Sequence, residues 1–256
     1  MKRIRVIPVL LLQNRGLVKT IKFKKTNYIG DPINAVKIFN EKEVDELAFL
    51  DIEATKLQKE PNYKIIEEIA SECFMPLAYG GGIMNIEQIK KIFNIGVEKI
   101  IINTSAYKTP QLITEAAKIY GNQSIAASID VKKDIFGKYK CFINSGKTKI
   151  KQNIIDYVKM LEQLGAGELI LTSIDKEGTF SGYDTYLIEK ISELVSIPVV
   201  ANGGASNIND FAKAINTGAS AVAAGSVFVY KSENRGVLIN YPSQKELKEK
   251  LFSKIS

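Results

Sequence analysis

The sequence contains no histidine at any of its 256 positions, and this absence excludes several kinds of site. Nucleophilic triads, zinc sites and general bases that depend on an imidazole ring are ruled out. Cysteine is also scarce: the chain has only Cys73 and Cys141, which lie far apart and form no CxxC pair. We therefore expect no disulfide framework and a reducing, cytoplasmic location, and we predict neither a metal site nor a cofactor.

Long apolar runs and blocks of basic residues are missing as well. The apolar run near the N-terminus, Val6–Leu12, is too short to span a membrane, and no small-residue cleavage site follows it. The net charge is +7, but Lys and Arg are spread along the chain, so we predict no binding to nucleic acid or membrane. A mildly basic surface favours phosphorylated ligands or an acidic protein partner instead.

What the sequence does contain is eight short, mostly apolar runs that alternate with amphipathic segments. Such runs are typical of strands covered on both faces, and segments that open on Asn, Asp or Thr and close on Gly are typical of helices. The pattern predicts a single (β/α)8 TIM barrel; the alternative, a doubly wound sheet, lacks a GxGxxG after the first strand. The expected strands are Arg5–Leu11, Glu46–Asp51, Pro76–Gly80, Lys99–Asn103, Ser124–Asp130, Glu168–Ser173, Pro198–Ala201 and Ala221–Gly225.

The two halves of the sequence repeat each other. Residues 75–108 resemble residues 197–231, and matched positions are separated by 122 residues. The matched pairs are Pro76 with Pro198, Gly82 with Gly204, Thr104 with Ser226 and Glu46 with Glu168. We therefore predict one domain with a two-fold half-barrel repeat, with halves at approximately 1–122 and 123–256.

The repeat duplicates a glycine–hydroxyl pattern at the expected strand ends. Glycine lets backbone N–H groups approach an anion, a hydroxyl adds a donor, and a helix N-terminus adds a favourable dipole. Two such cradles predict a ligand with phosphate at both ends, or two phosphorylated ligands, whereas the alternative is that the glycines only form tight turns. The residues concerned are Gly81, Gly82, Asn103 and Thr104 in the first half, and Gly178, Gly203, Gly204, Gly225 and Ser226 in the second.

Several motifs resemble one family over nearly the whole chain. The segments "GDPINAVKIFNEKEVDELAFLDI", "YGGGI", "INTSA", "LTSIDKEGTFSGYD" and "GGAS" are similar to those of HisF, the cyclase subunit of imidazole glycerol phosphate synthase. The resemblance implies a glutaminase partner at the N-terminal face of the barrel and ammonia passing through the barrel to a bisphosphate ligand. It also implies ring closure by two aspartates, at the ends of the first and fifth strands.

Only one of those two aspartates is present. Asp130 occupies the fifth-strand position, but Leu11 stands at the first-strand position, where a side chain able to transfer a proton is expected. Positioned acid–base groups typically contribute 10²–10⁴-fold in rate, so cyclase activity is in doubt. Further departures from the family pattern are expected on the same face, at Glu53, Glu177 and Asn202.

Other residues of this face have two interpretations each. Lys19 either covers an anionic ligand or is a solvated lysine, and Asp51 either contacts ligand or binds a loop backbone. Asp175 is expected to cap a loop or contact a ligand hydroxyl, since a carboxylate does not bind phosphate directly. Ser145 and Gly146 resemble a ligand-contacting loop.

The opposite face retains the family's ring of alternating charges. The resemblance places an ammonia gate at the beginnings of four strands, and Glu98 beside it is a candidate contact with the glutaminase. The alternative is that each residue is an ordinary exposed charge at a strand start. The gate residues are Arg5, Glu46, Lys99 and Glu168.

A retained gate with half of the cyclase pair missing resembles the sugar-amidation paralogues of HisF, the WbuZ type. The resemblance implies a HisH-like glutaminase and an ATP-using N-acetyl-sugar amidotransferase as partners, in surface-polysaccharide or flagellin-glycan synthesis. Two alternatives stay open at this point. One is a genuine cyclase of histidine biosynthesis, and the other is a non-catalytic scaffold that binds a bisphosphate.

Overall fold

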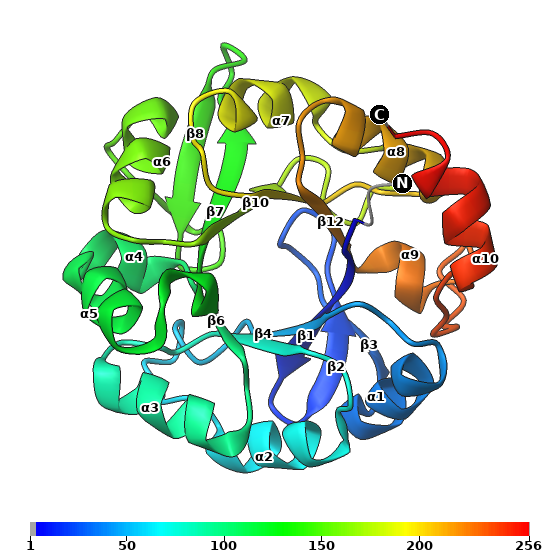
Figure 1. Cartoon of the computed structure of the whole chain (residues 1–256), viewed down its shortest axis with the longest axis horizontal. Coiled ribbons are helices and arrows are strands. Elements are labelled where there is room, and N and C mark those ends of the chain that lie inside the picture. The colour runs from blue at the N-terminus through cyan, green and yellow to red at the C-terminus, as the bar shows by residue number, and fades with distance from the viewer. Residues whose placement is uncertain (1–3, 256) are drawn as a thin grey trace.

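The eight expected strands form one closed parallel sheet in the computed structural model, which describes residues 4–255. Each strand pairs with the next, and the last pairs with the first through Val6 and Val222, which closes the barrel (Figure 1). The doubly wound alternative is thereby excluded and the TIM-barrel prediction confirmed. The strands are β1 (Val6–Gln13), β4 (Leu47–Asp51), β5 (Leu77–Gly80), β6 (Lys99–Ile102), β7 (Ile125–Lys133), β10 (Glu168–Ser173), β11 (Val199–Asn202) and β12 (Ala221–Ala224).

Helices surround the sheet and connect successive strands (Figure 1). Most of the long ones begin at an Asn or Asp whose side-chain oxygen accepts a backbone N–H of the first turn, as in Asn85 and Asp184. Thr109 does not cap the helix that follows it, because Pro110 occupies that position. The helices are α1 (Pro32–Glu41), α2 (Tyr63–Glu72), α3 (Ile86–Ile95), α4 (Thr104–Lys108), α5 (Gln111–Tyr120), η1 (Asn122–Ser124), α6 (Ile154–Gln163), α7 (Thr185–Ser192), α8 (Ile208–Asn216), α9 (Ser226–Val229), α10 (Gln244–Leu247) and η2 (Lys248–Phe252).

Four further strands extend the sheet on the side where the barrel strands end. They are β2 (Gly16–Lys19), β3 (Asn27–Gly30), β8 (Tyr139–Ile143) and β9 (Thr148–Lys149), and they pair antiparallel with β1 or β7 or with each other. The first strand, expected to end at Leu11, continues to Gln13, and the chain turns back through Asn14 at a φ of 55°. These extensions rise around the mouth of the barrel and shape the site described below.

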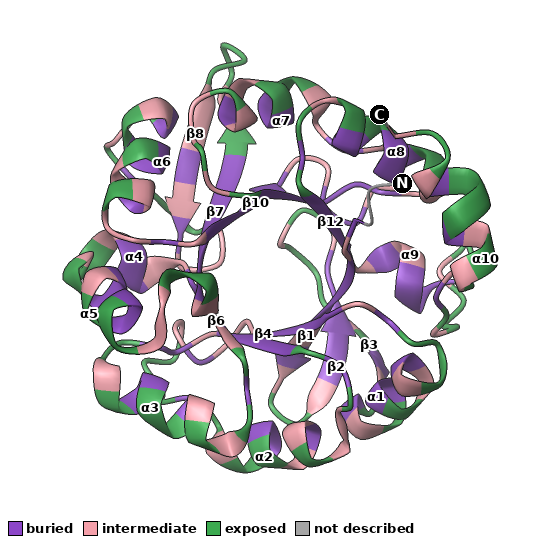
Figure 2. Ribbon diagram, viewed as in Figure 1, coloured by how far each residue is buried: buried purple, intermediate pink, exposed green. Residues whose placement is uncertain are grey.

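Two separate cores follow from the alternation of side chains along each strand. The larger core fills the space between sheet and helices, where Figure 2 shows the helices buried on their inward sides. The smaller core lies inside the barrel and consists of small and branched side chains: Ile7, Val9, Ala48, Ala78, Ile101, Ala126, Ile170, Val200, Ala221 and Ala223. The interior of the barrel is therefore apolar over its middle section.

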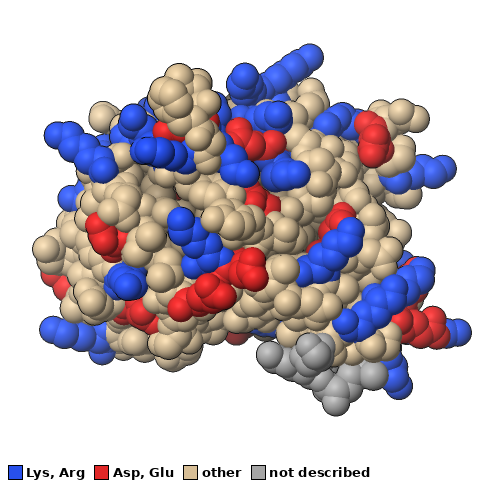
Figure 3. Space-filling model, turned by 90° about the horizontal axis from the view of Figure 1, so that it is seen from above, with Lys and Arg blue, Asp and Glu red and all other residues tan. Residues whose placement is uncertain are grey.

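Tyr79 and Tyr183 pack into the larger core, as expected for structural tyrosines, and the Tyr183 hydroxyl donates to the carbonyl of Ala223 at 2.9 Å. Among residues 4–255, no helix combines the length and apolar character needed to span a bilayer. On the side of the molecule seen in Figure 3, Lys and Arg crowd the upper edge with few acidic side chains among them.

Candidate functional site

Inward-facing residues of β1 form a column that runs through the whole barrel. Because side chains alternate along a strand, Arg5, Ile7, Val9 and Leu11 share one face. Ile7 and Val9 lie in the inner core, Leu11 packs against that core, and both Val9 and Leu11 line a cavity at the strand ends. One column thus begins at a charged ring and ends at the cavity.

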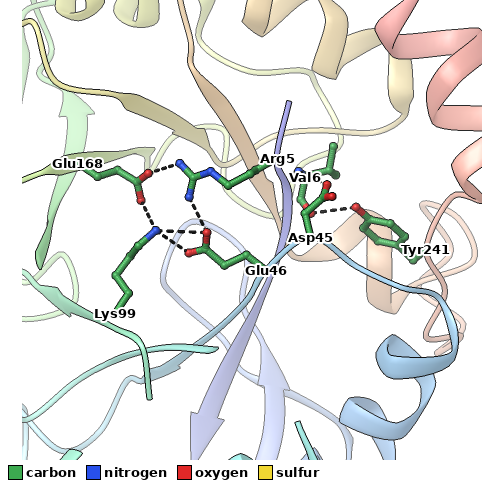
Figure 4. A network of polar contacts seen from close by, with 7 residues as sticks. All are labelled: Arg5, Val6, Asp45, Glu46, Lys99, Glu168 and Tyr241. Atoms are coloured by element: carbon green, nitrogen blue, oxygen red, sulfur yellow. Dashed lines mark hydrogen bonds and ion pairs between the residues drawn. The ribbon is translucent and has the colours of Figure 1, made fainter. Parts of the chain in front are cut away.

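The charged ring closes the barrel at the beginnings of the strands (Figure 4). Lys99 Nζ lies 2.9 Å from Glu46 Oε1 and 3.1 Å from Glu168 Oε1, and the Arg5 guanidinium forms ion pairs with the same two carboxylates. Glu46 and Glu168 are buried, whereas the side chain of Arg5 is 35% exposed. The two cations bridge the two anions, so neither buried carboxylate is left without a partner. The ordinary exposed-charge interpretation is therefore wrong for these four residues.

The cavity lies at the opposite end of the barrel and collects the sequence-predicted ligand residues. It is lined by Leu11, Lys19, Asp51, Gly81, Gly82, Asn103, Thr104, Asp130, Ser145, Gly178, Gly203, Gly204, Gly225 and Ser226. Gly146 and Asp175 are absent from this lining. Gly146 packs against Phe23, and Asp175 Oδ2 accepts the backbone N–H of Lys133 at 2.9 Å.

Glycine occupies the positions of the two cradles for different physical reasons. A Cβ on Gly81 would lie 2.3 Å from the carbonyl oxygen of Asp51, and one on Gly204 would lie 2.2 Å from that of Gly182, so backbone packing alone requires glycine there. Gly225 has an ordinary φ of −112°, and a Cβ there would meet the side chain of Lys19 at 2.8 Å. Its neighbour Ser226 is 5% exposed, and its hydroxyl has no hydrogen-bond partner in the structure. Ser226 therefore offers the clearest free donor for an anion, and the side chain of Lys19 lies against its neighbour Gly225.

Lys19 is buried, which excludes the solvated-lysine interpretation. Its ammonium forms an ion pair with Glu177, whose other oxygen accepts the Thr20 hydroxyl at 3.1 Å and the Phe23 N–H at 3.4 Å. The backbone N–H of Lys22 also donates to the carbonyl of Glu177 at 3.0 Å. The segment after β2 is thereby attached to the loop after β10 across the cavity.

Asp130 is the acid most changed by its surroundings. It is 7% exposed, and burial, followed by the nearby Glu177 charge, raises its pKa to about 7. The Asn103 amide donates to Asp130 Oδ2 at 3.2 Å. Leu11 lines the same cavity but has no proton donor or acceptor. Asp130 is therefore not paired with a second acid from β1.

The remaining departures from the family pattern all have local partners. Glu53 accepts a 2.9 Å hydrogen bond from the Gln13 amide, and Asn202 donates to the Thr172 hydroxyl at 3.0 Å. The Asp51 carboxylate accepts the N–H groups of Glu53 and Ala54, as its loop-binding interpretation requires, while also facing the cavity.

Lys56 is a cavity residue that the sequence did not single out. It is half-buried beside Thr55, whose hydroxyl accepts the Gly82 N–H at 3.2 Å. Burial, followed by the nearby charge of Lys147, lowers the pKa of Lys56. A second cation thus stands near the first-half cradle, and no sequence motif distinguishes it from the many surface lysines. Within the described part of the chain, no three acidic or cysteine side chains gather closely enough to hold a metal ion.

Comparisons with known proteins agree with this geometry. Residues 5–234 match the family described as "Histidine biosynthesis protein". The chain is 50% identical over 248 residues to the Pseudomonas aeruginosa protein named "Putative imidazole glycerol phosphate synthase subunit hisF2", with 96% of this chain and 99% of that protein covered. It is 50% identical over 254 residues to a Leptospira borgpetersenii protein named "Putative imidazole glycerol phosphate synthase subunit HisF" (98% and 100% covered).

A more distant relative carries the same subunit name. The chain is 38% identical over 227 residues to "Imidazole glycerol phosphate synthase subunit HisF" of Alkaliphilus metalliredigens, with 88% of this chain and 90% of that protein covered. The family match, the near-complete coverage of the relatives and the barrel geometry all support the same family assignment. The chain therefore belongs to the HisF family of histidine biosynthesis proteins.

Proposed function

We propose that this chain is an ammonia-channelling subunit that partners a HisH-like glutaminase and supplies ammonia for amidination of an N-acetyl sugar. The acceptor is a sugar of a surface polysaccharide or flagellin glycan, and the amidinating enzyme is an ATP-using N-acetyl-sugar amidotransferase. One observation carries the proposal: the column of β1 keeps Arg5 in the charged ring but ends in Leu11 at the cavity. The charged entrance is retained, although the acid–base pair at the opposite end of the barrel is incomplete.

The interior between the two ends suits a small neutral molecule. Alanine at positions 48, 78, 126, 221 and 223 keeps the middle of the barrel apolar and its side chains short. Unpaired ammonium is excluded from such a section by the loss of hydration, whereas neutral ammonia pays a much smaller desolvation penalty. Ammonia released beside the ring would thus reach the cavity without mixing with ammonium in bulk water.

The face that carries the ring also offers features for a partner. Glu98 is exposed in the turn immediately before Lys99, and Phe74, in the turn before β5, is 85% exposed. Loops that precede the strands all lie at this end of the barrel, so both residues lie on the face that carries the ring. An exposed aromatic beside an acidic side chain fits a protein partner that carries a basic residue, and we assign this face to the glutaminase.

The cavity is assigned to a phosphorylated small molecule. Ser226 supplies the free hydroxyl, Gly225 lets the Lys19 side chain lie beside it, and Lys19 and Lys56 supply the positive charge. In the unliganded chain, the Glu177 carboxylate is the negative partner of Lys19 that a bound anion would replace.

A second candidate function is imidazole glycerol phosphate synthesis itself. Asp130 favours it, because a buried carboxyl with a pKa of about 7 can both accept and donate a proton at neutral pH. The names of the relatives point in the same direction. A third, the non-catalytic scaffold, requires that the chain stimulate no glutaminase.

The deciding experiment mixes the purified chain with candidate HisH-like glutaminases and measures glutamine hydrolysis. Channelling predicts copurification and stimulated hydrolysis. A parallel assay supplies ammonium salt and the family's ribonucleotide substrate and measures imidazole glycerol phosphate. Turnover at the rate of a functional cyclase would establish the second candidate, and failure to bind or stimulate any glutaminase would overturn channelling, as the scaffold predicts.

A further inference from the structure

The hairpin between β7 and β8 exposes two large apolar side chains at its tip. Ile135 is 93% exposed and Phe136 is 79% exposed. Ile135 has the largest exposed fraction among the exposed large apolar residues of the described chain. Tyr186, 63% exposed, stacks on Tyr139 next to the tip of the hairpin with ring centroids 6.3 Å apart. We call Ile135, Phe136 and Tyr186 the hairpin patch.

The tip is held in one conformation although it projects into solvent. The Asp134 carboxylate accepts the N–H groups of Phe136 at 3.0 Å and Lys138 at 2.9 Å, and the Asp134 N–H donates to the Lys138 carbonyl at 2.9 Å. Gly137 completes the turn at a φ of 75°. These bonds fix the backbone that presents Ile135 and Phe136. The loss of conformational entropy when a partner covers them is therefore small.

The strand pair next to the tip, Lys133 and Tyr139, is fastened to the segment between β10 and α7. The Tyr139 hydroxyl donates to Asp184 at 2.9 Å, and the Lys133 N–H donates to Asp175. Asp175 therefore supports the hairpin and does not face the cavity. Figure 1 shows the loop between β7 and β8 reaching beyond the ring of helices.

The charge around the tip is positive. Residues 132–140 read KKDIFGKYK and contain four lysines against one aspartate. Lys133 and Lys140 lie 3.7 and 3.8 Å from the carboxylates of Asp184 and Asp134, distances at which exposed pairs are weak. An apolar tip with a lysine collar is complementary to a protein surface that offers an apolar pocket with an acidic rim.

The position of the hairpin indicates which of the two proposed partner proteins it contacts. β7 carries Asp130 on the cavity wall, and the hairpin tip begins four residues later at the same end of the barrel. The charged ring lies at the opposite end, so a glutaminase there cannot reach the tip. We propose that the hairpin patch docks the N-acetyl-sugar amidotransferase over the cavity, so that ammonia leaving the barrel enters that enzyme directly. This inference rests on the proposed function.

The test uses the double variant Ile135→Ser/Phe136→Ser, with Ile119→Ser on the outer surface of α5 as a matched control. Ile119 is 61% exposed, and all three changes remove apolar area from the surface without opening a core. We expect the double variant to bind the purified amidotransferase at least tenfold more weakly and to lose glutamine-dependent amidination. Stimulation of the glutaminase, amidination driven by added ammonium salt, and the melting temperature should stay as in the wild-type chain.

The outcomes separate this proposal from the function on which it rests. If the wild-type chain supports glutamine-dependent amidination and the double variant does so equally, docking through the hairpin is overturned and the proposed function stands. If the wild-type chain stimulates no glutaminase and supports no amidination, the proposed function fails and the docking proposal with it.

Two other occupants of the patch would also overturn the docking proposal. One is a membrane surface: the wild-type chain, but not the double variant, would bind vesicles of phosphatidylglycerol while both bind the amidotransferase equally. The other is a second copy of the chain: the wild-type chain would be dimeric and the double variant monomeric in gel filtration, again with equal amidotransferase binding.

Discussion

The Lys19 ammonium and the Glu177 carboxylate form an ion pair across the mouth of the cavity, and each side chain is only 7% exposed. Lys19 comes from β2 and Glu177 from the loop after β10, so the pair joins the two halves of the barrel. It also places the lysine over Gly225, next to the unpartnered hydroxyl of Ser226. A phosphate bound at Ser226 would compete with Glu177 for this ammonium.

The first prediction concerns Glu177→Gln, which leaves the Lys19 ammonium without its carboxylate partner. Removing one member of a buried pair is expected to lower the free energy of unfolding by about 3–5 kcal/mol. Inorganic phosphate should restore more stability to this variant than to the wild-type chain, because it binds the folded state and supplies the missing negative charge. Thermal melts at increasing phosphate concentration measure both effects.

Its control is the double variant Lys19→Met/Glu177→Gln, in which both charges are gone. This variant should be more stable than Glu177→Gln alone and should respond less to phosphate. An equal phosphate response in the two variants would show that Lys19 does not contact the anion.

The second prediction concerns Asp130→Asn and its dependence on pH. The pKa of Asp130 in the folded chain, about 7, exceeds the value of about 3.9 in an unfolded chain, so the native state binds the proton more tightly. The wild-type free energy of unfolding therefore falls as pH rises from about 4 to about 7. Asparagine mimics the neutral acid, so the variant should match the wild-type chain only below about pH 4, exceed it by about 1.5 kcal/mol at pH 5 and exceed it by up to about 4 kcal/mol at pH 8.

Urea unfolding at the two pH values measures this difference. Asp134→Asn serves as the control, because backbone hydrogen bonds lower the pKa of that exposed carboxyl and keep it ionised throughout this range. Its difference from the wild-type chain should be the same at pH 5 and pH 8. A pH-independent difference for Asp130→Asn as well would mean that Asp130 is ionised in the folded chain at pH 5.

The third prediction concerns Lys99→Ala in the charged ring. Glu46 and Glu168 would then share Arg5 alone, and we expect the free energy of unfolding to fall by about 3 kcal/mol. Amidination supported by glutamine should fall as well, whereas amidination supported by added ammonium salt should not. Lys37→Ala breaks the exposed pair with Glu72 at 3.8 Å and should lower stability by less than about 1 kcal/mol.

The fourth prediction concerns Leu11→Asp, which restores the first-strand acid of the family. A complete acid–base pair would be worth about 10²–10⁴-fold in rate. We expect a gain in imidazole glycerol phosphate formation below about tenfold, because Glu53, Glu177 and Asn202 are held by Gln13, Lys19 and Thr172 in an arrangement the family pattern lacks. A gain of a hundredfold or more in the ammonium-dependent assay would contradict this explanation and make position 11 alone decisive.

The barrel itself was predictable because each of its strands is a local feature. Apolar runs of four to seven residues, separated by capped amphipathic segments, identified all eight barrel strands, with ends correct to within a few residues. The antiparallel extensions β2, β3, β8 and β9 were not predicted, because polar and basic residues such as Lys19 and Lys140 hide their strand character. The half-barrel boundary near residue 122 stays a prediction; it falls at η1, between β6 and β7.

The candidate site was predictable to the extent that it follows from position along a strand. Residues at strand ends converge on one cavity whatever their partners are, and Gly82, Thr104, Gly203 and Ser226 all do so. Gly146 and Asp175 lie outside the cavity lining, because each is on a loop whose path depends on other loops, and Asp175 binds a backbone N–H, which is one of its two expected roles. Lys56 was missed for the same reason: its half-buried position is created by the packing of the segment after β4.

The sequence by itself determined the eight barrel strands and their order, because an apolar run bounded by capped amphipathic segments is a local feature. Since the strands of such a barrel all point the same way, it also placed Arg5 at the end where the strands begin and Leu11 at the end where they finish. Only the tertiary structure decided that Arg5, Glu46, Lys99 and Glu168 bond to one another and that Lys19 binds Glu177. These contacts join residues 41 to 163 positions apart, and only closure of the sheet brings such distant positions within bonding distance.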